Sequence, residues 1–362
     1  MTPISMPYTA MLIVPTGVGA AIGGYAGDAL PVARAIAQVV DCLITHPNVL
    51  NGAQLYWPIA NALYVEGYGL DQVALGRWGL RPVQQNRIGL VLDAGIEPDL
   101  RWRQLQAADA ARATLGLSLT DYVVTDAPLG VSLQTADSGA TWGTIQRPDS
   151  LLRAVEAAIH RGGAEAIAVV ARFPDDVGSD ALTQYRQGQG VDPLAGAEAV
   201  ISHLVVKTFR LPCAHAPALQ PLPLDPSISP RSAAEELGYT FLPCVLAGLS
   251  RAPQFTDRVD AHSIWANHIQ TLIAPDSACG GAAVLGLSQT ARLITVGDNS
   301  TMMQASPDTL GLSALRVTSY LEAIGAIAAE RAGVHLDALT PTLLPLRPLS
   351  SPPLSTSELS CE

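Results

Sequence analysis

A glycine-rich turn that follows a short apolar run is the feature that most restricts how this chain can fold. Met11–Val14 is apolar, glycines follow at positions 17, 19, 23 and 24, and an apolar helical pattern begins near Ala29. Glycine permits sharp backbone turns and leaves amide groups open to a ligand. The stretch is therefore typical of the first strand, turn and helix of a ligand-binding α/β protein.

Short β-rich runs alternate with helical patterns along most of the sequence. The expected strands are Met11–Val14, Cys42–Thr45, Ala62–Val65, Ile88–Leu92, Tyr122–Thr125, Ala166–Ala171, Tyr239–Leu246, Thr271–Ala274 and Leu293–Val296. The expected helices are Ala29–Val40, Arg101–Leu115, Ser150–Arg161, Pro193–Val206, Gly281–Ser288 and Leu315–Ala332. This alternation favours an α/β fold of Rossmann-like type, with a mostly parallel sheet and helices on both faces.

Four segments can be distinguished by composition. Residues 1–175 predict an N-terminal α/β domain that contains the glycine-rich turn, and residues 233–340 predict a second, smaller α/β lobe. Between them, residues 176–232 are rich in proline and predict a stiff connector or a cleft wall. Residues 341–362 are rich in Pro, Ser and Leu and predict a flexible tail.

Composition also narrows the possible partners and the location. A net charge of −11 without a basic cluster argues against nucleic-acid binding. The chain has no unbroken apolar run of about 18 residues, so we expect no membrane span. Five widely spaced cysteines and no secretory signature favour reduced thiols and a cytoplasmic location. The low share of charged residues, 15%, leaves a homo-oligomer open.

Ligands of open parallel sheets bind at the carboxyl ends of the strands, and polar residues follow several of the expected strands. The acid–base candidates are His46, Glu66, Asp93 and Asp126. The candidates for holding a ligand are Thr16, Gly17, Gly19, Gly23, Gly24, Asn48, Arg172, Arg251, Asp298 and Asn299. Carboxylates that lie close together raise one another's pKa or hold a divalent cation. The alternative is that each residue forms a turn or a helix cap.

The spacing of the glycines argues against NAD as a cofactor. Gly17, Gly19 and Gly23 follow the pattern G-x-G-x-x-x-G, whereas dinucleotide-binding turns follow G-x-G-x-x-G. The second expected strand ends in Thr45-His46, where such folds have an acidic residue for the ribose. We therefore expect the turn to bind the carboxylate or phosphate of a smaller ligand.

The cysteines allow two kinds of chemistry. Cys279 lies just before an expected helix, whose N-terminus would lower the pKa of the thiol and make it a nucleophile. His215, His46 or His262 would then be its base. Alternatively, Cys213, Cys244 and Cys279 together hold zinc or an iron–sulfur cluster, although no C-x-x-C pair is present. The third interpretation is that these thiols are small buried apolar groups.

Four stretches of the sequence also carry a resemblance to a known family. They are residues 15–24, 45–48, 213–219 and 278–281. With these stretches the chain resembles a family of uncharacterised proteins found in cyanobacteria and related plastid lineages. The resemblance extends over residues 10–340. It implies a cytosolic or stromal setting and supplies no catalytic residues.

Together these observations predict a soluble metabolic enzyme that binds a small anionic metabolite in a cleft at the ends of the strands. Acid–base or thiol chemistry of the lyase, isomerase or hydrolase type is expected, because no redox-cofactor motif is present. Two alternatives remain open. The chain is a metal or iron–sulfur protein that uses its cysteines, or it binds or assembles without catalysis.

Overall fold

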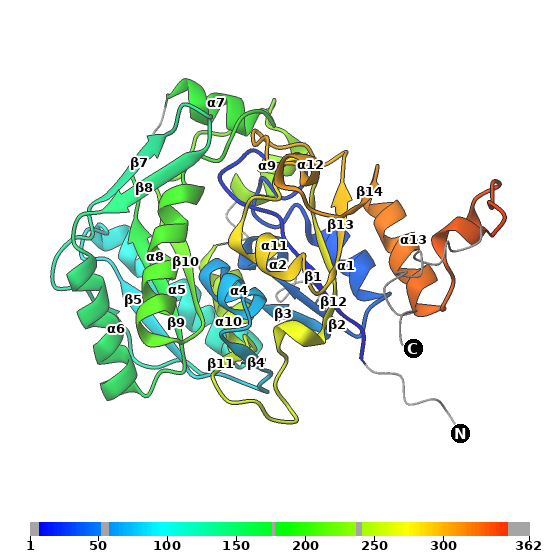
Figure 1. Ribbon diagram of the computed structural model, residues 1–362. Coiled ribbons are helices and arrows are strands. Elements are labelled where there is room, and N and C mark those ends of the chain that lie inside the picture. Colours follow the sequence, from blue (N-terminus) through cyan, green and yellow to red (C-terminus); the bar gives the residue numbers. More distant parts are fainter. Residues whose placement is uncertain (1–6, 52–57, 176–177, 237–240, 347–362) are drawn as a thin grey trace, which may run out of the picture.

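The largest sheet of the protein has six parallel strands in the order β14-β13-β12-β1-β2-β3 (Figure 1). It is seen in a computed structural model that describes residues 7–51, 58–175, 178–236 and 241–346. The strands are β1 (Thr9–Leu12), β2 (Cys42–Thr45), β3 (Ala62–Tyr64), β12 (Ile269–Pro275), β13 (Arg292–Val296) and β14 (Leu315–Val317). Counted along the chain, their spatial order is 3-2-1-4-5-6, which is the order of doubly wound Rossmann-like sheets.

A second parallel sheet has four strands in the order β10-β9-β5-β6. These strands are β5 (Ile88–Leu92), β6 (Val123–Val124), β9 (Ala166–Arg172) and β10 (Cys213–Ala218). Two antiparallel pairs complete the described strands: β7 (Val131–Thr135) with β8 (Thr141–Ile145), and β4 (Gly79–Arg81) with β11 (Gln254–Thr256).

Both sheets are buried on both faces. Leu12 and Leu92 belong to one hydrophobic core, and their neighbours Met11 and Val91 belong to another. The first core is covered by α1 (Leu30–Ala37), α2 (Pro47–Leu50), α5 (Pro98–Leu115), α10 (Leu242–Ser250) and α13 (Tyr320–Arg331). The second is covered by α4 (Gly67–Ala74), α6 (Pro148–Gly162), α8 (Ala195–Phe209) and α11 (Ala282–Leu287). Helices on both faces of parallel sheets confirm the expected α/β fold.

Shorter helices fill the connections. They are α7 (Asp180–Arg186), α9 (Pro230–Glu236), α12 (Pro307–Leu310) and the 3-10 helices η1 (Ala266–His268) and η2 (Leu336–Leu339). Among the longer helices, α5 and α6 begin two to three residues before the predicted starts, because Pro98 and Pro148 occupy their first turns. Gly116 and Gly163 end them in the left-handed conformation, with φ of 68° and 67°.

Two predicted elements differ from the structure. The predicted strand Tyr239–Leu246 is wrong in its described part, where Leu242–Ser250 is helix α10; residues 239 and 240 lie outside the described residues. Every side chain of α10 except Pro243 is buried, so no amphipathic pattern distinguishes it from a buried strand. The predicted helix Leu315–Ala332 begins instead as strand β14, and α13 starts only after Ser319, whose hydroxyl accepts the Glu322 N–H at 3.4 Å.

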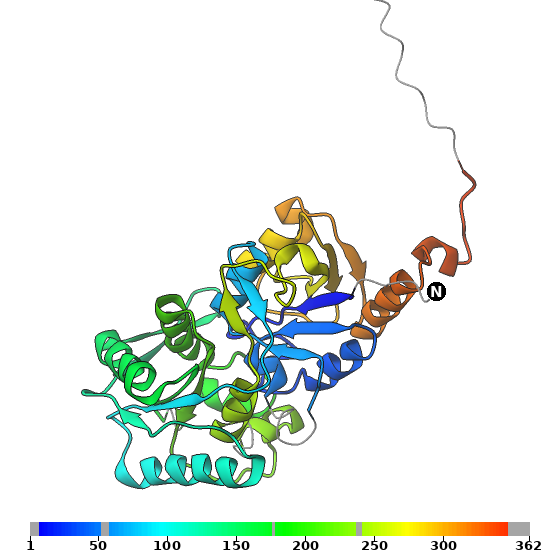
Figure 2. The same ribbon diagram turned by 90° about the horizontal axis from the view of Figure 1, so that it is seen from below.

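The sheets join segments that the sequence pattern separates. β12 lies between β1 and β13, so strands from residues 1–175 and residues 233–340 form one sheet. The predicted proline-rich connector contains helices α7 and α8 before strand β10, which pairs with β9 at the edge of the second sheet. Pro217 is tolerated there because an edge strand needs hydrogen-bond donors on one side only. In Figure 2 the blue β1–β3 region therefore adjoins the yellow and orange C-terminal strands, and the cyan and green elements form the other half.

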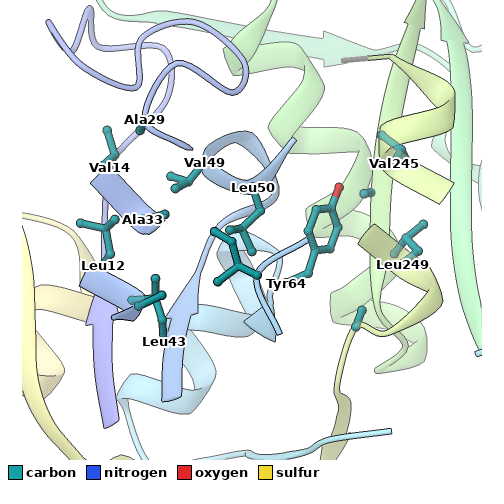
Figure 3. Close-up of a cluster of buried hydrophobic side chains, with 14 of the residues drawn as sticks. Leu12, Val14, Ala29, Ala33, Leu43, Val49, Leu50, Tyr64, Val245 and Leu249 are labelled. Atoms are coloured by element: carbon teal, nitrogen blue, oxygen red, sulfur yellow. The ribbon is translucent and has the colours of Figure 1, made fainter. Parts of the chain in front are cut away.

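Helix α10 joins the two halves of the molecule. In Figure 3 the ring of Tyr64, from β3, lies between Leu50 and the α10 residues Val245 and Leu249. A Cβ at Gly248 would lie 2.4 Å from the Tyr64 ring, so only glycine lets the helix and the ring come this close. The edge of the first sheet is thereby fixed against the second half, which positions the cleft described next.

Candidate functional site

The carboxyl ends of β1 and β12 face a cavity of about 490 Å³. These two strands are neighbours, but the chain leaves β1 toward β2 and leaves β12 toward β13, on opposite sides. The connections therefore diverge and leave a crevice, as they do at the switch point of other doubly wound sheets. Thr16, His46, Asp71, His203 and Gly280 are among the residues that line it. We call this space the main cavity.

His46 follows β2 and begins α2. Its Nδ1 accepts the backbone N–H of Asn48 at 3.1 Å, so the proton of the neutral ring is on Nε2. Burial, together with the charges of His215 and His203, lowers the pKa of His46 to about 3. His46 is therefore an uncharged hydrogen-bond donor at neutral pH.

The pKa of His203, on α8, is shifted in the opposite direction to that of His46. Its Nε2 lies 2.9 Å from Oε1 of Glu66, which follows β3 and has a side chain only 2% exposed. The Glu66 carboxylate also accepts the N–H groups of Tyr68 and Gly69 at the start of α4, at 2.9 and 3.3 Å. Burial of His203 opposes its charge, but the hydrogen bond and charge of Glu66, with Asp71, prevail and raise the pKa of His203.

A single glycine allows these two imidazoles to approach the same point. A Cβ at Gly67 would lie 2.9 Å from Nε2 of His203 and 3.7 Å from Nε2 of His46. Nε2 of His46 and Nε2 of His203, which also contacts Glu66, therefore both lie near the start of α4. Because both residues line the main cavity, a small molecule there meets one imidazole with a lowered pKa and one with a raised pKa.

A third histidine lies beside the main cavity. A smaller cavity of about 40 Å³ shares Thr16, His46 and Ala199 with it and is also lined by His215 of β10. The Nε2 atom of His215 lies 3.5 Å from Oε2 of Glu198, and its Nδ1 lies 3.2 Å from the Ser202 hydroxyl.

The Ser202 hydroxyl connects the two histidine pairs. It donates to Oε1 of Glu66 at 3.4 Å, the same oxygen that His203 contacts. Glu198, Ser202 and His203 all come from α8, where positions four apart lie on one face of the helix. One helix thus supplies both a serine that links the pairs and an acid or base in each.

Of the residues proposed from the sequence, Thr16 and His46 line the main cavity, and Glu66 reaches it through its contact with His203. Of the residues just described, His203, Glu198 and Ser202 were missed, and His215 was considered only as a base for Cys279. The sequence signal that could have identified them is the spacing of Glu198 and Ser202, which are four residues apart in a helical pattern, with His203 following Ser202. That spacing indicates a polar face on an otherwise apolar helix, but not what the face meets.

The glycine-rich turn forms the predicted sharp bends, but its contacts differ from those expected. Gly17, Gly19 and Gly23 have φ of 71°, 63° and 94°, and a Cβ at Gly24 would lie 2.4 Å from the Ala20 carbonyl. The amide of Gly23 donates to Oδ1 of Asp28 at 2.6 Å. The protein thus occupies a donor that a bound anion would need.

Two asparagines fasten this turn from the neighbouring strand ends. Asn299 is fully buried; its Oδ1 accepts the Ile22 N–H and its Nδ2 donates to the Ile22 carbonyl, both at 2.9 Å. Asn48 Nδ2 donates to the Gly23 carbonyl at 3.2 Å. Both were candidates for ligand binding, and both hold the turn in shape.

Asp93, Asp126 and Arg172 lie at the ends of the second sheet, outside the residues that line the two cavities at His46. The buried Asp93 carboxylate accepts the N–H groups of Gly95, Leu129 and Arg172, which makes it a structural support. Exposed Asp126 pairs with Arg153, whose hydrogen bonds, with that of Ser150, hold the Asp126 pKa far below its usual range.

The arginine and aspartate candidates for ligand binding are also placed elsewhere. Arg172 is held by Asp175 at 2.7 Å and by Glu97 at 2.8 Å. Arg251 and Asp298 are exposed and do not line the two cavities at His46. The predicted convergence of strand-end residues therefore holds for Thr16 and His46 of the first sheet, but not for Asp298 or for the residues of the second sheet. Sequence patterns did not reveal that there are two sheets.

The structure does not give Cys279 the expected low pKa. Its Sγ is buried and lies 3.5 Å from the Pro275 carbonyl, and burial, with the charge of Asp276, raises its pKa to about 11. The following helix, α11, begins only at Ala282. Cys213 and Cys244 are also buried. In the described residues, no three His, Cys, Asp or Glu side chains are arranged to hold a metal ion.

Comparison with known proteins identifies the family. Residues 9–340 match a family described as protein of unknown function, DUF3326. The chain is 62% identical over 336 residues to an uncharacterized lipoprotein of Synechococcus sp., an alignment that covers 92% of this chain and 93% of that protein. No solved structure matches the chain. In the part of the chain that the structure describes, no helix has the length and apolar character needed to cross a membrane. The resemblance to a cyanobacterial family is confirmed, and the chain belongs to the DUF3326 family of proteins of unknown function.

Proposed function

We propose that this protein is an enzyme that transfers protons to and from a small polar molecule bound in the main cavity. The observation that carries the proposal is the pair His46 and His203, whose side chains face one point while their surroundings shift their pKa values in opposite directions. Such opposed shifts mark the acid and base assignments of many active sites. A purely structural role would not require two imidazoles to line a cavity.

The two rings have different roles in this proposal. His203, paired with Glu66, gives a proton to the substrate and can take one back. Uncharged His46 donates a hydrogen bond from Nε2 to a substrate oxygen and stabilises negative charge that develops there. Proton transfer next to a polarised oxygen fits an isomerase or lyase, and hydrolysis is the second candidate within the same chemistry.

The charge of the lining favours a ligand without net negative charge. Among the described residues that line the main and smaller cavities, the ionisable side chains are histidines, Tyr64 and the carboxyl groups of Asp71, Asp192 and Glu198, with no lysine or arginine. An anionic metabolite would find no lysine or arginine there, and only histidines as positive partners. We therefore replace the expected anionic substrate by a neutral or positively charged one.

Incubation of the protein with a mixture of small metabolites, followed by mass spectrometry, tests the proposal. Wild-type protein is expected to deplete one compound, and His203→Gln is expected to deplete it at least about a hundredfold more slowly, because a positioned acid or base contributes about that much. Asp298→Asn, an exposed change outside the cavities, serves as the control and should match wild type.

Two results would contradict the proposal. One is depletion at equal rates by wild type and His203→Gln. The other is a compound that binds and raises the melting temperature of the protein but is never consumed, which would indicate a binding protein. The location is a separate matter: the word lipoprotein describes the Synechococcus relative, and a cytoplasmic location for this chain stays a prediction that cell fractionation can test.

A further inference from the structure

A third cavity, of about 340 Å³, adjoins the smaller cavity that His215 lines. We call it the apolar cavity, because its lining is dominated by apolar side chains. Leu100 of α5, Leu182 of α7, Leu219 and Leu222 after β10, and Phe241 before α10 all contribute to it. Protein interiors are packed nearly as densely as organic crystals, so a space of this size lined by leucines is an unusual feature.

The apolar cavity adjoins the smaller cavity that contains His215. Asp192, Pro217 and Phe241 line both spaces. The smaller cavity in turn shares Thr16, His46 and Ala199 with the main cavity. The three spaces therefore form a series, with a narrow middle at His215 and a wide space at each end. The polar end holds His46 and His203, and the other end is apolar.

Polar groups also lie in the wall of the apolar cavity, where Tyr185 and Glu235 line it and Asp192 lies at its border with the smaller cavity. The hydroxyl of Tyr185 donates to Oε2 of Glu235 at 2.6 Å, and the same oxygen accepts the Ala26 N–H at 3.0 Å. Burial raises the pKa of Glu235 to about 7 and raises that of Asp192 well above its ordinary value. A protonated carboxyl group loses less solvation free energy beside an apolar ligand than a charged carboxylate does, because the neutral group needs less water around it.

We propose that the apolar cavity binds a hydrocarbon part of the same ligand whose polar part reaches His46 and His203. The ligand is then amphipathic, with a neutral or cationic head and an apolar tail of roughly ten carbon-sized groups, judged from the volume occupied per molecule in liquid water. This inference rests on the proposed function for the position of the head, whereas the cavity for the tail is defined by its own residues.

Straight-chain alcohols from 1-butanol to 1-octanol provide a probe of the apolar cavity that needs no knowledge of the natural ligand. Isothermal titration calorimetry of the wild-type protein should give affinities that rise about fourfold for each added methylene, the increment expected for full burial of that group. Affinities that do not depend on chain length would overturn the inference.

The variant Leu182→Trp tests whether the alcohols bind in the apolar cavity, which Leu182 lines. The larger side chain should fill the apolar cavity and weaken 1-octanol binding at least tenfold. Ala181→Trp places the same ring on the same helix at an exposed position outside the cavity lining, and its affinity should equal that of wild type. If Leu182→Trp is poorly folded by circular dichroism, Leu222→Trp replaces it. Equal weakening by Ala181→Trp, or none by the cavity variants, would contradict the assignment.

His203→Gln separates this inference from the proposed function. Alcohol binding should persist in that variant, because His203 does not line the apolar cavity. If alcohols bind as described but no metabolite is consumed, the proposed function fails and the apolar cavity stands. If a consumed metabolite carries no hydrocarbon part, and Leu182→Trp consumes it as fast as wild type, the inference fails and the proposed function stands.

Discussion

At the scale of single residues, Gly67 shows how the site depends on the absence of one methyl group. This glycine opens α4 directly after Glu66, and the missing Cβ leaves room for the ring of His203. The fold does not need a glycine there for its backbone, because the φ of Gly67 is not in the left-handed region. Glycine is therefore needed at this position to leave room for the contact between His203 and Glu66, and not for the backbone of the helix.

Gly67→Ala is therefore expected to damage the site more than the fold. The added methyl group would lie 2.9 Å from Nε2 of His203, whose side chain is 41% exposed and can move away from Glu66. Loss of that contact should lower the pKa of His203 toward its ordinary value and slow turnover at least about tenfold, because a displaced acid or base loses part of its contribution of about a hundredfold. Turnover assays and a histidine NMR titration measure both effects.

Gly325→Ala is the matched control for that variant. Gly325 is exposed within α13, and a Cβ there would meet no atom within 4 Å. Alanine should stabilise this helix by up to about 1 kcal/mol and leave turnover unchanged. If Gly67→Ala behaves like Gly325→Ala in both assays, the approach of the two imidazoles at Gly67 does not matter to the activity.

At the scale of elements, the glycine-rich turn owes its shape to contacts from distant strands. Asn299 follows β13 and Asn48 follows β2, and both hold the backbone of residues 22–23. The sequence predicts a sharp turn at the correct place, since Gly17 and Gly23 require positive φ. It cannot show that asparagines 25 and 277 residues away would take up the hydrogen bonds of the turn.

Asn299→Ala tests that description. The change leaves the amide and carbonyl of half-buried Ile22 without the Asn299 side chain, which should cost about 2 kcal/mol of unfolding free energy, in the range for unsatisfied polar groups. Urea unfolding followed by circular dichroism gives the value. Asp298→Ala changes the exposed neighbour and should stay within about 0.5 kcal/mol of wild type. Equal stability of the two variants would mean that the hydrogen bonds of Asn299 do not stabilise the glycine-rich turn.

At the scale of the whole molecule, the sequence predicts the fold class better than the arrangement of the chain. Strands such as Cys42–Thr45 and Ile88–Leu92 are predicted with their observed bounds, because short apolar runs end at turn residues. Nothing local indicates that β12 inserts beside β1, or that β5 begins a second sheet. Pairing between strands is decided by contacts across hundreds of residues, which single-sequence patterns do not contain.

The same limit explains which site residues were predicted. His46 and Glu66 follow strands of one sheet, and the rule for strand ends places them together correctly. Asp93 and Asp126 obey the same rule on another sheet, so they lie elsewhere. His203 comes from the face of α8 that packs toward α4, a contact that only the folded molecule reveals.

The central claim is that His46 and His203 are neighbours whose pKa values are shifted in opposite directions, and an NMR titration of the seven histidines tests it most directly. His46→Gln and His203→Gln assign the two signals. The account predicts that His203 titrates above 6.5 and shifts downward in Glu66→Gln, while His46 stays neutral between about pH 5 and 8. Two histidines that titrate together near 6.5, with no response of His203 to Glu66→Gln, would contradict it.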